Sequence, residues 1–401
     1  MHVHALSHNW AAHPFLRNRF PVISNGQIQK IIDAGINELE IDTAKGLDVI
    51  EGTNSEAVVT APVLKEQVLV NAAAPIFAEA VSFTEEIVRA RSLKDQALHL
   101  VQGLMQDARL GKIIELERAE PVVHEIVASI TRNSSALLAL LQIKNKDDYT
   151  FLHSVSVCAL LAAFCRSLGM QPEVTYQAAL GGLVHDLGKS LVPDAILNKP
   201  GRLTETEFDV IKRHPQDGHA ILSAIAGIGP VPLDITLRHH ERLDGNGYPG
   251  KLGGDAISEL AQMAAIVDVY DAITAQRCYH QAMSPSSALG KLHEWSETQY
   301  SPRLVQAFIR CLGIYPSGSL VLLQSGRLGV VTQQHEENIL KPSVNVFFST
   351  RSNTYISPQT VDLLKSSGRE GGDKILRAET PARWQVDPLR FLEINETARS
   401  S

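Results

Sequence analysis

His185 and Asp186 place an imidazole and a carboxylate side by side in a largely apolar run of the chain. Further histidines and aspartates recur between residues 153 and 268, beside apolar or helix-forming residues. A divalent metal of hard-to-borderline character prefers these ligand types where no thiolate is offered. An unpaired buried polar group costs about 2 kcal/mol or more, so packing alone does not explain such residues. The pattern therefore predicts a metal site with seven ligands: His153, His185, Asp186, His214, His239, His240 and Asp268.

The adjacent pairs indicate that more than one metal is bound. Neighbouring side chains on a helix point about 100° apart, so His185 and Asp186 can face neighbouring ions, with the carboxylate bridging them. His239 and His240 can likewise address different ions. Two metals roughly 3.5 to 4 Å apart generate a hydroxide at neutral pH and hold a phosphoryl oxygen, which is the chemistry of phosphodiester hydrolysis.

The single residues differ in what they indicate. Asp268 stands among apolar residues of a helical run, where a carboxylate must be paired or coordinated. Asp271 shares part of that face and is either the hydrogen-bond partner of a ligand or an acid at a helix end, and the two readings weigh equally. His214 alone is a weak signal, because a histidine before a proline often ends a helix, and His219 is interpreted as structural.

Lys189 and a glycine-rich run complete the candidate site. Lys189, one turn past His185, can neutralise a phosphate oxygen or protonate a leaving alkoxide, and its alternative is a solvent-exposed lysine after a helix end. The run from Asp244 to Gly250 follows the histidine pair directly, and its glycines and Pro249 impose tight turns. Tyr248 offers a ring for stacking on a base, and backbone amides of the loop could hold an anion.

Helical patterns from about residue 76 to 315 must position these groups. Residues 153–169 are apolar nearly all round, which predicts a central helix. Gly188 is expected to stop the helix that carries His185. Thr204 and Glu207 form a capping-box pattern at the start of a helix that we expect to run into His214. The middle of the chain is therefore an all-α bundle, with a core over residues 120–312.

The two ends of the chain have sequence patterns that differ from the helical patterns of the middle. Residues 1–50 read as a small α+β domain, with strand-like residues 3–6 and 38–42 around a helix at 26–34, and residues 51–75 read as linker. Residues 316–401 read as a small β-rich C-terminal module, with a hairpin turn at 325–327, an alternating strand at 343–350 and a loop at 366–376. The expected fold is multidomain and mainly α.

Composition narrows the class of function. The chain has 401 residues and a formal net charge of −7, which argues against nucleic-acid binding as the main task. Its cysteines, Cys158, Cys165, Cys278 and Cys311, show no metal-ligand spacing, and three of them stand beside apolar helical residues, so we expect a reducing cytoplasm. No apolar run is long enough to span a membrane, and the N-terminus lacks a signal-peptide pattern.

The ordered motifs resemble the HD-GYP family, bacterial phosphodiesterases of the HD superfamily that hydrolyse cyclic di-GMP. The resemblance runs from about Tyr149 to Leu312 and includes HDLGK, HHERLDGNGYPG and DVYDAITAQR. Near the N-terminus, HPFLRNRF and IDTAKG look like the small domain of unknown function that often precedes HD-GYP units. The resemblance implies that the central bundle is an HD-type domain.

The resemblance also implies roles for particular residues. The family's metal ligands fall on the same seven residues, its lysine on Lys189, and its signature loop on the substrate-binding residues Gly247, Tyr248 and Pro249. Arg277 matches a phosphate-gripping arginine, whereas His280 stands where the family usually has lysine or arginine, and a neutral imidazole grips phosphate less well. Tyr149 stands where three-metal members carry a glutamate, which favours two divalent ions, with Fe or Mn expected.

The first hypothesis is a cytoplasmic, metal-dependent phosphodiesterase that hydrolyses cyclic di-GMP to pGpG and/or GMP through a metal-bridging hydroxide. Asp186 and Lys189 are its expected catalytic groups. One alternative is a cyclic-dinucleotide receptor or interaction module without turnover, and another is an HD hydrolase for a different cyclic dinucleotide. Protein partners could bind through the N-terminal domain, and the chain could form a homodimer.

Overall fold

The computed structural model describes residues 2–6, 20–21, 39–41, 79–143, 149–275, 282–335, 337–365 and 372–392. The chain divides into two compact units, Met1–Ala72 and Ala73–Ser401. The first contains β1 (His2–Leu6), β2 (Phe20–Pro21) and β3 (Leu39–Ile41), antiparallel in the order β2-β1-β3. The expected strands near both ends of this region are therefore present, whereas the expected helix at 26–34 and the linker at 51–75 lie outside the described residues.

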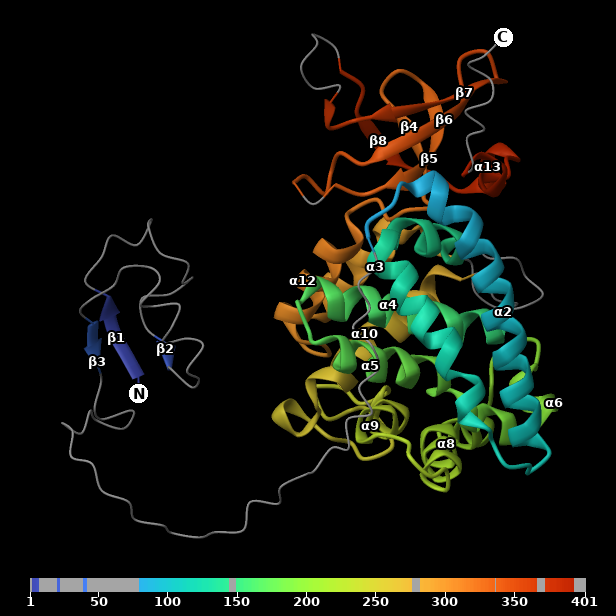
Figure 1. Cartoon of the computed structure of the whole chain (residues 1–401), viewed down its shortest axis with the longest axis vertical. Helices are drawn as coiled ribbons and strands as arrows, with labels where there is room; N and C mark the ends of the chain where they lie inside the picture. Colours follow the sequence, from blue (N-terminus) through green and yellow to red (C-terminus); the bar gives the residue numbers. More distant parts are fainter. Residues whose placement is uncertain are drawn as a thin grey trace. The chain divides into compact units, whose positions relative to one another are not determined.

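The second unit begins with a helical bundle (Figure 1). Its α-helices are α2 (Phe83–Arg109), α3 (Glu120–Gln142), α4 (Tyr149–Ser167), α5 (Pro172–Val184), α6 (Asp194–Leu197), α7 (Glu205–Ile211), α8 (His214–Ser223), α9 (Pro230–Arg238), α10 (Glu259–Thr274), α11 (Pro285–Trp295) and α12 (Pro302–Leu312). Short 3-10 helices are η1 (Leu116–Arg118), η2 (Leu187–Leu191) and η3 (Gly254–Ala256). The expected mainly α fold is confirmed.

Local sequence signals explain where several helices begin. The side chains of Ser82, Thr204, Ser258, Ser284 and Ser301 each accept a hydrogen bond from a backbone amide in the first turn of the following helix. Such caps satisfy amides that have no partner inside the helix. At Thr204 the Glu207 side chain also bonds back to the cap, so the expected capping box is confirmed.

Helix α4 is the central helix of the bundle. Residues 152–165 are all buried, and the helix packs against α3, α5 and α10. A helix that is apolar all round is stable only when neighbours cover every face, which is why this segment lies at the centre. The central helix expected from the sequence is confirmed.

Two helix boundaries near the histidines differ from expectation. Helix α5 ends at Val184 rather than at Gly188, which lies inside η2. A Cβ on Gly188 would lie 2.0 Å from the carbonyl oxygen of His214, so glycine serves a close approach between η2 and α8 rather than a helix stop. His214 begins α8 instead of ending α7, because Pro215 stands in the first turn, where its missing amide proton is tolerated.

A five-stranded antiparallel sheet follows the helices. Its strands are β4 (Leu320–Leu323), β5 (Arg327–Gln333), β6 (Ser343–Ser349), β7 (Thr354–Asp362) and β8 (Ile375–Ala378), in the order β7-β6-β5-β4-β8. The last elements are α13 (Pro381–Trp384) and η5 (Pro388–Phe391). The hairpin expected at residues 325–327 is present, with Gly326 at a φ of 82°. The prediction of a loop at 366–376 is wrong at its end, because β8 begins at Ile375.

The sheet shares a core with the helices. Leu320, Leu322 and Leu328 belong to the hydrophobic cluster that also contains α2 and α3, and Figure 1 shows the sheet against one end of the bundle. Val344 and Val346 on the opposite face form a smaller cluster. Because both faces are covered, residues 343–348 of β6 are all buried instead of alternating. Among the described residues, no helix combines the length and apolar character needed to cross a bilayer.

Candidate metal centre

The side chains predicted as ligands converge on one place in the bundle. His153 comes from α4, His185 and Asp186 follow α5, His214 begins α8, His239 and His240 follow α9, and Asp268 lies in α10. Six of them are at most 5% exposed, and the side chain of His240 is 20% exposed. The ligand atoms form three groups within 4.8 Å: His214, His239 and His240; His153, His185 and Asp268; and His185, Asp186 and His239.

Asp186 stands between two groups of imidazoles. Its Oδ2 lies 3.6 Å from Nε2 of His153 and 3.4 Å from Nε2 of His185. Its Oδ1 lies 3.2 Å from Nε2 of His214 and 3.8 Å from Nε2 of His239. Each oxygen therefore faces a different pair of histidines, which is the arrangement of a carboxylate that can bridge two cations.

Asp268 completes the arrangement from α10. Its Oδ1 lies 2.9 Å from Nε2 of His153 and 3.8 Å from Nε2 of His185. Its Oδ2 lies 3.6 Å from Nδ1 of His240. Helix α10 thus contributes a carboxylate oxygen to His153 and His185, and its other oxygen faces the partly exposed His240.

Hydrogen bonds on the outer nitrogens orient four of the imidazoles. The Nδ1 of His185, His214 and His239 lies 2.8, 2.7 and 2.9 Å from the backbone carbonyls of residues 182, 211 and 236, to which it must donate. The Nδ1 of His153 lies 2.7 Å from Oδ2 of Asp271. When a cation is bound, such bonds select the tautomer whose Nε2 lone pair faces it. Of the two readings of Asp271, the partner of a ligand is the one that this contact supports.

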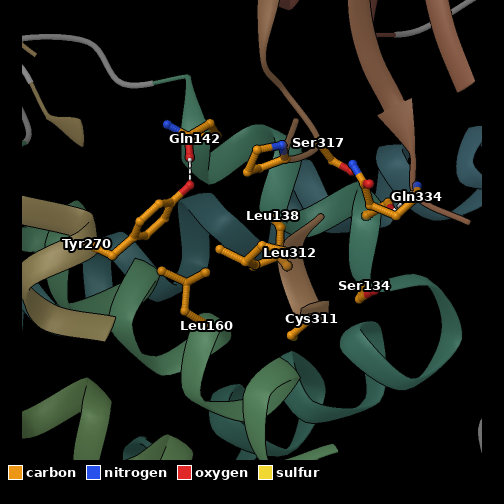
Figure 2. A pocket seen from close by; sticks show the side chains of 11 residues that line it. Ser134, Leu138, Gln142, Leu160, Tyr270, Cys311, Leu312, Ser317 and Gln334 are labelled. Atoms are coloured by element: carbon orange, nitrogen blue, oxygen red, sulfur yellow. Dashed lines mark hydrogen bonds between the residues drawn. The ribbon is translucent and has the colours of Figure 1, made fainter. Parts of the chain in front are cut away.

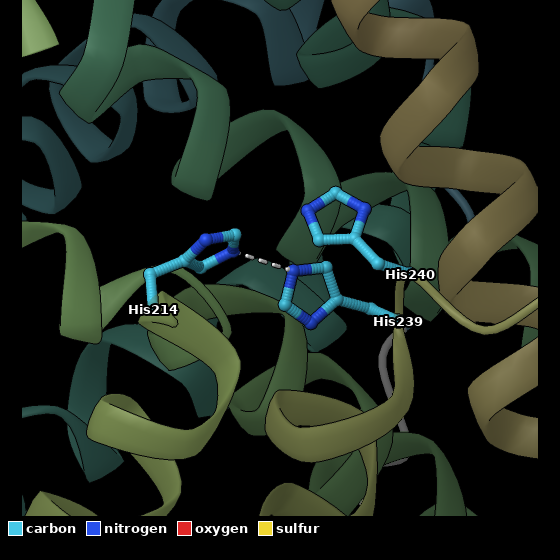
Figure 3. Close-up of side chains that lie close together, drawn as sticks. All are labelled: His214, His239 and His240. Carbon is cyan, nitrogen blue, oxygen red and sulfur yellow. Dashed lines mark hydrogen bonds between the residues drawn. The ribbon is translucent and has the colours of Figure 1, made fainter. Parts of the chain in front are cut away.

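The polar atoms at the centre are suited to binding a cation. Nε2 of His185 and Oδ1 of Asp186 are buried without a hydrogen-bond partner. Figure 3 shows His214 and His239 pointing toward each other, with their Nε2 atoms 3.2 Å apart. Both rings already donate from Nδ1, so in the neutral form two lone pairs face each other. A divalent ion of the Fe, Mn, Co, Ni or Zn type, which accepts imidazole nitrogen and carboxylate oxygen, fits this donor set.

The surroundings of the histidines shift their pKa values in opposite directions. Burial lowers the pKa of His214, lowers that of His240 to about 3, and together with neighbouring imidazoles places that of His239 well below its ordinary value. Burial also opposes charge on His185, but Asp186 and Asp268 outweigh it and raise the pKa of His185 to about 10. His214, His239 and His240 are therefore neutral at physiological pH, the form that can bind a cation.

The two carboxylates are ionised. Burial acts to raise the pKa of Asp186, but His185 and Lys189 outweigh it and hold this pKa well below its usual range. Hydrogen bonds from His153 and His185 do the same for Asp268 against burial. Nζ of Lys189 lies 2.6 Å from Oδ2 of Asp186, and its side chain is 20% exposed. The ammonium of Lys189 therefore contacts the central carboxylate of Asp186, while the lysine itself lies at the partly exposed edge of the cluster.

The glycine-rich loop lies over His240. The Tyr248 amide donates to the His240 carbonyl at 3.2 Å, and the two ring centroids are 4.6 Å apart with an angle of 32° between the rings. Gly247 has no room for a side chain, because a Cβ would lie 2.5 Å from Cα of Glu241. Tyr248 therefore packs on a candidate ligand at the rim of the cluster.

Glu241 is a residue of the site that the sequence reasoning missed. It is 3% exposed, and its carboxylate accepts the amides of Gly250 at 2.5 Å and Leu252 at 2.9 Å. These bonds hold the loop that carries Tyr248. A carboxylate directly after the histidine pair and before the glycines was the available signal. Arg277 and His280, expected to hold phosphate, lie outside the described residues, as does the side chain of Tyr149.

A separate small pocket lies between α3, α4, α10, α12 and the end of β5 (Figure 2). Tyr270 donates its hydroxyl to Oε1 of Gln142 there at 3.1 Å. None of the seven predicted ligands lines it. The pocket is therefore not part of the metal centre.

Comparison with known proteins gives matches over nearly the whole chain. A model described as "HD domain" matches residues 126–304, and one described as "Domain of unknown function (DUF3391)" matches residues 1–119. The chain is 42% identical over 391 residues to the cyclic di-GMP phosphodiesterase PA4108 of Pseudomonas aeruginosa, covering 97% of this chain and 92% of that protein.

Other relatives match mainly the helical region. The chain is 33% identical over 240 residues to the cyclic di-GMP phosphodiesterase response regulator RpfG of Xanthomonas campestris, covering 59% of this chain and 63% of that protein. It is 36% identical over 178 residues to 3'3'-cGAMP-specific phosphodiesterase 1 of Vibrio cholerae, covering 44% of this chain and 41% of the relative. A solved HDG"Y"P protein of Bdellovibrio bacteriovorus, Bd1817, aligns with a TM-score of 0.48 at 20% identity, over 56% of this chain and 71% of that one.

Proposed function

The chain belongs to the HD-domain cyclic di-GMP phosphodiesterases, as its motifs predict, and on that premise we propose that it hydrolyses cyclic di-GMP to pGpG, and in a second cut to GMP. The observation that carries the proposal is Asp186, whose two oxygens face two different groups of imidazoles. A bridging carboxylate between two cation sites suits in-line displacement at a phosphodiester.

The proposed metal ligands divide into two sets that share Asp186. His153, His185 and Asp268 would hold one ion, and His214, His239 and His240 the other. Fe or Mn is the expected ion at both sites from the resemblance to the family, since imidazole and carboxylate donors alone would also accept Co or Ni. When bound, such a pair supplies an activated hydroxide at neutral pH and neutralises the charge that develops on the phosphate.

The chain's own groups would bind and orient the dinucleotide. Lys189 holds an ammonium beside Asp186 and at the partly exposed edge of the cluster, where it can approach a phosphate oxygen or donate a proton to the leaving oxygen. The loop of Gly247, Tyr248 and Pro249 lies at the rim, and Glu241 keeps it there. Arg277 and His280 are proposed to hold the phosphates.

The test is product analysis on metal-loaded protein. Protein prepared without oxygen and loaded with iron or manganese should convert cyclic di-GMP to pGpG or GMP, resolved by chromatography and mass spectrometry. A variant with both His185→Ala and Asp186→Ala should lose both metal and turnover. Loaded wild-type protein that binds the dinucleotide but leaves it uncut would instead support the receptor alternative.

A matched pair on α8 controls for general damage. His214→Ala should remove a metal ligand, whereas His219→Ala, five residues further along the same helix, changes a histidine whose contact is with Ser223. The first variant should lose turnover and the second should keep it. Equal loss in both would contradict the proposed ligand set.

A second substrate is favoured by the similarity to a cGAMP-specific relative. The described part of the loop offers an aromatic ring, and a ring stacks on adenine and guanine alike. Rates on cyclic di-GMP and on 3'3'-cGAMP, measured with the same protein, decide between the two. A faster cut of 3'3'-cGAMP would replace the proposed substrate and leave the proposed chemistry intact.

A further inference from the structure

The last residue of helix α2 reaches the segment that carries Lys189. Nη1 and Nη2 of Arg109 donate to the two carboxylate oxygens of Asp194 at 2.9 and 2.8 Å, and Nε donates to the carbonyl of Ser190 at 3.3 Å. One guanidinium thus binds both η2 and the first residue of α6. The fork geometry of arginine makes such a contact directional.

The η2 segment has little freedom on its other side. Its Gly188 lies so close to α8 that a Cβ would meet the His214 carbonyl at 2.0 Å and the Gly218 amide nitrogen at 2.5 Å. Lys189, the next residue, places its Nζ 2.6 Å from Oδ2 of Asp186. Helix α8 therefore supports η2 from one side, and Arg109 holds it from the side of α2.

Helix α2 is suited to hold this segment in place. It runs for 27 residues, about 40 Å at the usual rise, from the end of the bundle near the C-terminal sheet to the end near α6 (Figure 1). Near its start, the fully buried Glu86 accepts two bonds from Arg132 of α3, at 2.7 and 2.8 Å. Near its end, Leu104, Met105 and Ala108 are buried in the hydrophobic core, so the last turn has a defined position.

The contact joins two regions that match different family models. Arg109 lies in the region matched by the domain of unknown function, whereas Lys189, Ser190 and Asp194 lie in the region matched by the HD domain. The side chains of Arg109 and Asp194 are 45% and 64% exposed, so the pair adds little to global stability. This partly exposed bidentate contact therefore fixes the position of η2 more than it stabilises the fold.

We propose that Arg109 is a positioning residue of the active site, which holds η2 so that Lys189 stays on Asp186. The region matched by the domain of unknown function thereby supplies a part of the catalytic arrangement. The proposal rests on the proposed function in that Lys189 acts on the phosphodiester there. Arg109 itself acts only through η2.

The test compares two variants at the end of α2 in the full chain. Arg109→Met keeps the aliphatic stem and removes the guanidinium. Asp107→Asn is the matched control, because Asp107 pairs with Lys112 and Arg118 and with no residue of η2. Both variants should change the midpoint of thermal unfolding by a similarly small amount.

The first readout does not depend on activity. Acetylation of Lys189 by a limiting amine-reactive reagent is followed by mass spectrometry, with Lys291 of α11 as internal reference. Arg109→Met should raise the relative rate at Lys189 about fivefold, the scale of a lost bidentate ion pair. Asp107→Asn should leave it at the wild-type rate. Equal rates in the two variants would overturn the proposal.

The second readout separates positioning from general damage. Arg109→Met should lower kcat on cyclic di-GMP about fivefold with KM unchanged, and it should cause no further loss in a Lys189→Met background. A full additional loss in that background would overturn the proposal. If wild-type protein cuts no cyclic dinucleotide, the proposed function fails, and the acetylation rates still decide the role of Arg109.

Discussion

Replacing Asp186 by asparagine removes one negative charge from the centre of the cluster without changing its shape. Four imidazole Nε2 atoms lie between 3.2 and 3.8 Å from its oxygens. A cation held by these imidazoles would be close to the carboxylate. At about 4 Å and an effective dielectric constant of about 20, one pair of unit charges contributes roughly 4 kcal/mol. We therefore expect manganese affinity to fall by about a thousandfold or more, since each 1.4 kcal/mol is tenfold.

The assay is titration of metal-free protein with manganese, paired with turnover on cyclic di-GMP. Asp209→Asn, an exposed aspartate of α7 paired with Lys212, is the control and should leave both unchanged. Asp271→Asn weakens the hydrogen-bond partner of His153 and should cost roughly 10- to 100-fold in affinity. An Asp186→Asn protein that binds manganese within threefold of the wild type would refute the bridging arrangement.

The same substitution has a consequence in the absence of metal. Asp186 and Asp268 together raise the pKa of His185 to about 10. With Asp186 neutral, that pKa should fall, because burial then meets less opposition. Titration of the His185 ring signal by NMR in EDTA measures it. An unchanged pKa would show that Asp186 does not contact His185 in the way described.

Three further predictions concern stability and the loop. Gly188→Ala should destabilise the fold by roughly 1 to 3 kcal/mol or more in urea unfolding, because its Cβ would overlap the His214 carbonyl, and a loss below 0.5 kcal/mol would contradict the close approach. Burial lowers the pKa of His239 and His240 in the native protein. Below about pH 6.5 these two imidazoles therefore become protonated in the unfolded chain but remain neutral in the native site. Metal-free protein should therefore lose stability as the pH falls below about 6.5, by roughly 1.4 kcal/mol per pH unit for His240 down to about pH 4. A falling thermal midpoint would show this loss, whereas a constant midpoint would refute the buried neutral state. Glu241→Gln should raise KM for the dinucleotide about tenfold at unchanged manganese stoichiometry, because one loop amide loses its charged acceptor. Loss of metal instead would assign Glu241 to the metal centre.

The sequence alone indicated which side chains gather in the buried cluster, because their chemistry is local. Imidazoles and carboxylates in apolar helical runs have few uses other than binding a cation or a proton, so ligand types could be read from single segments. The helix start at Thr204 was similarly predicted, because a cap acts within one turn. The hairpin at Gly326 followed from turn chemistry.

Tertiary structure decided how those groups meet. His153 and Asp268 are far apart in the chain, yet their atoms lie 2.9 Å apart because α4 and α10 pack together. No spacing rule predicts that Asp186 faces four histidines, or that Glu241 holds the loop, since both depend on contacts between segments. Gly188 serves the close approach of η2 to α8 instead of ending α5, and Pro215 places His214 at the start of α8. Local sequence determines which side chains are offered to the site, and packing determines which atoms they present to one another.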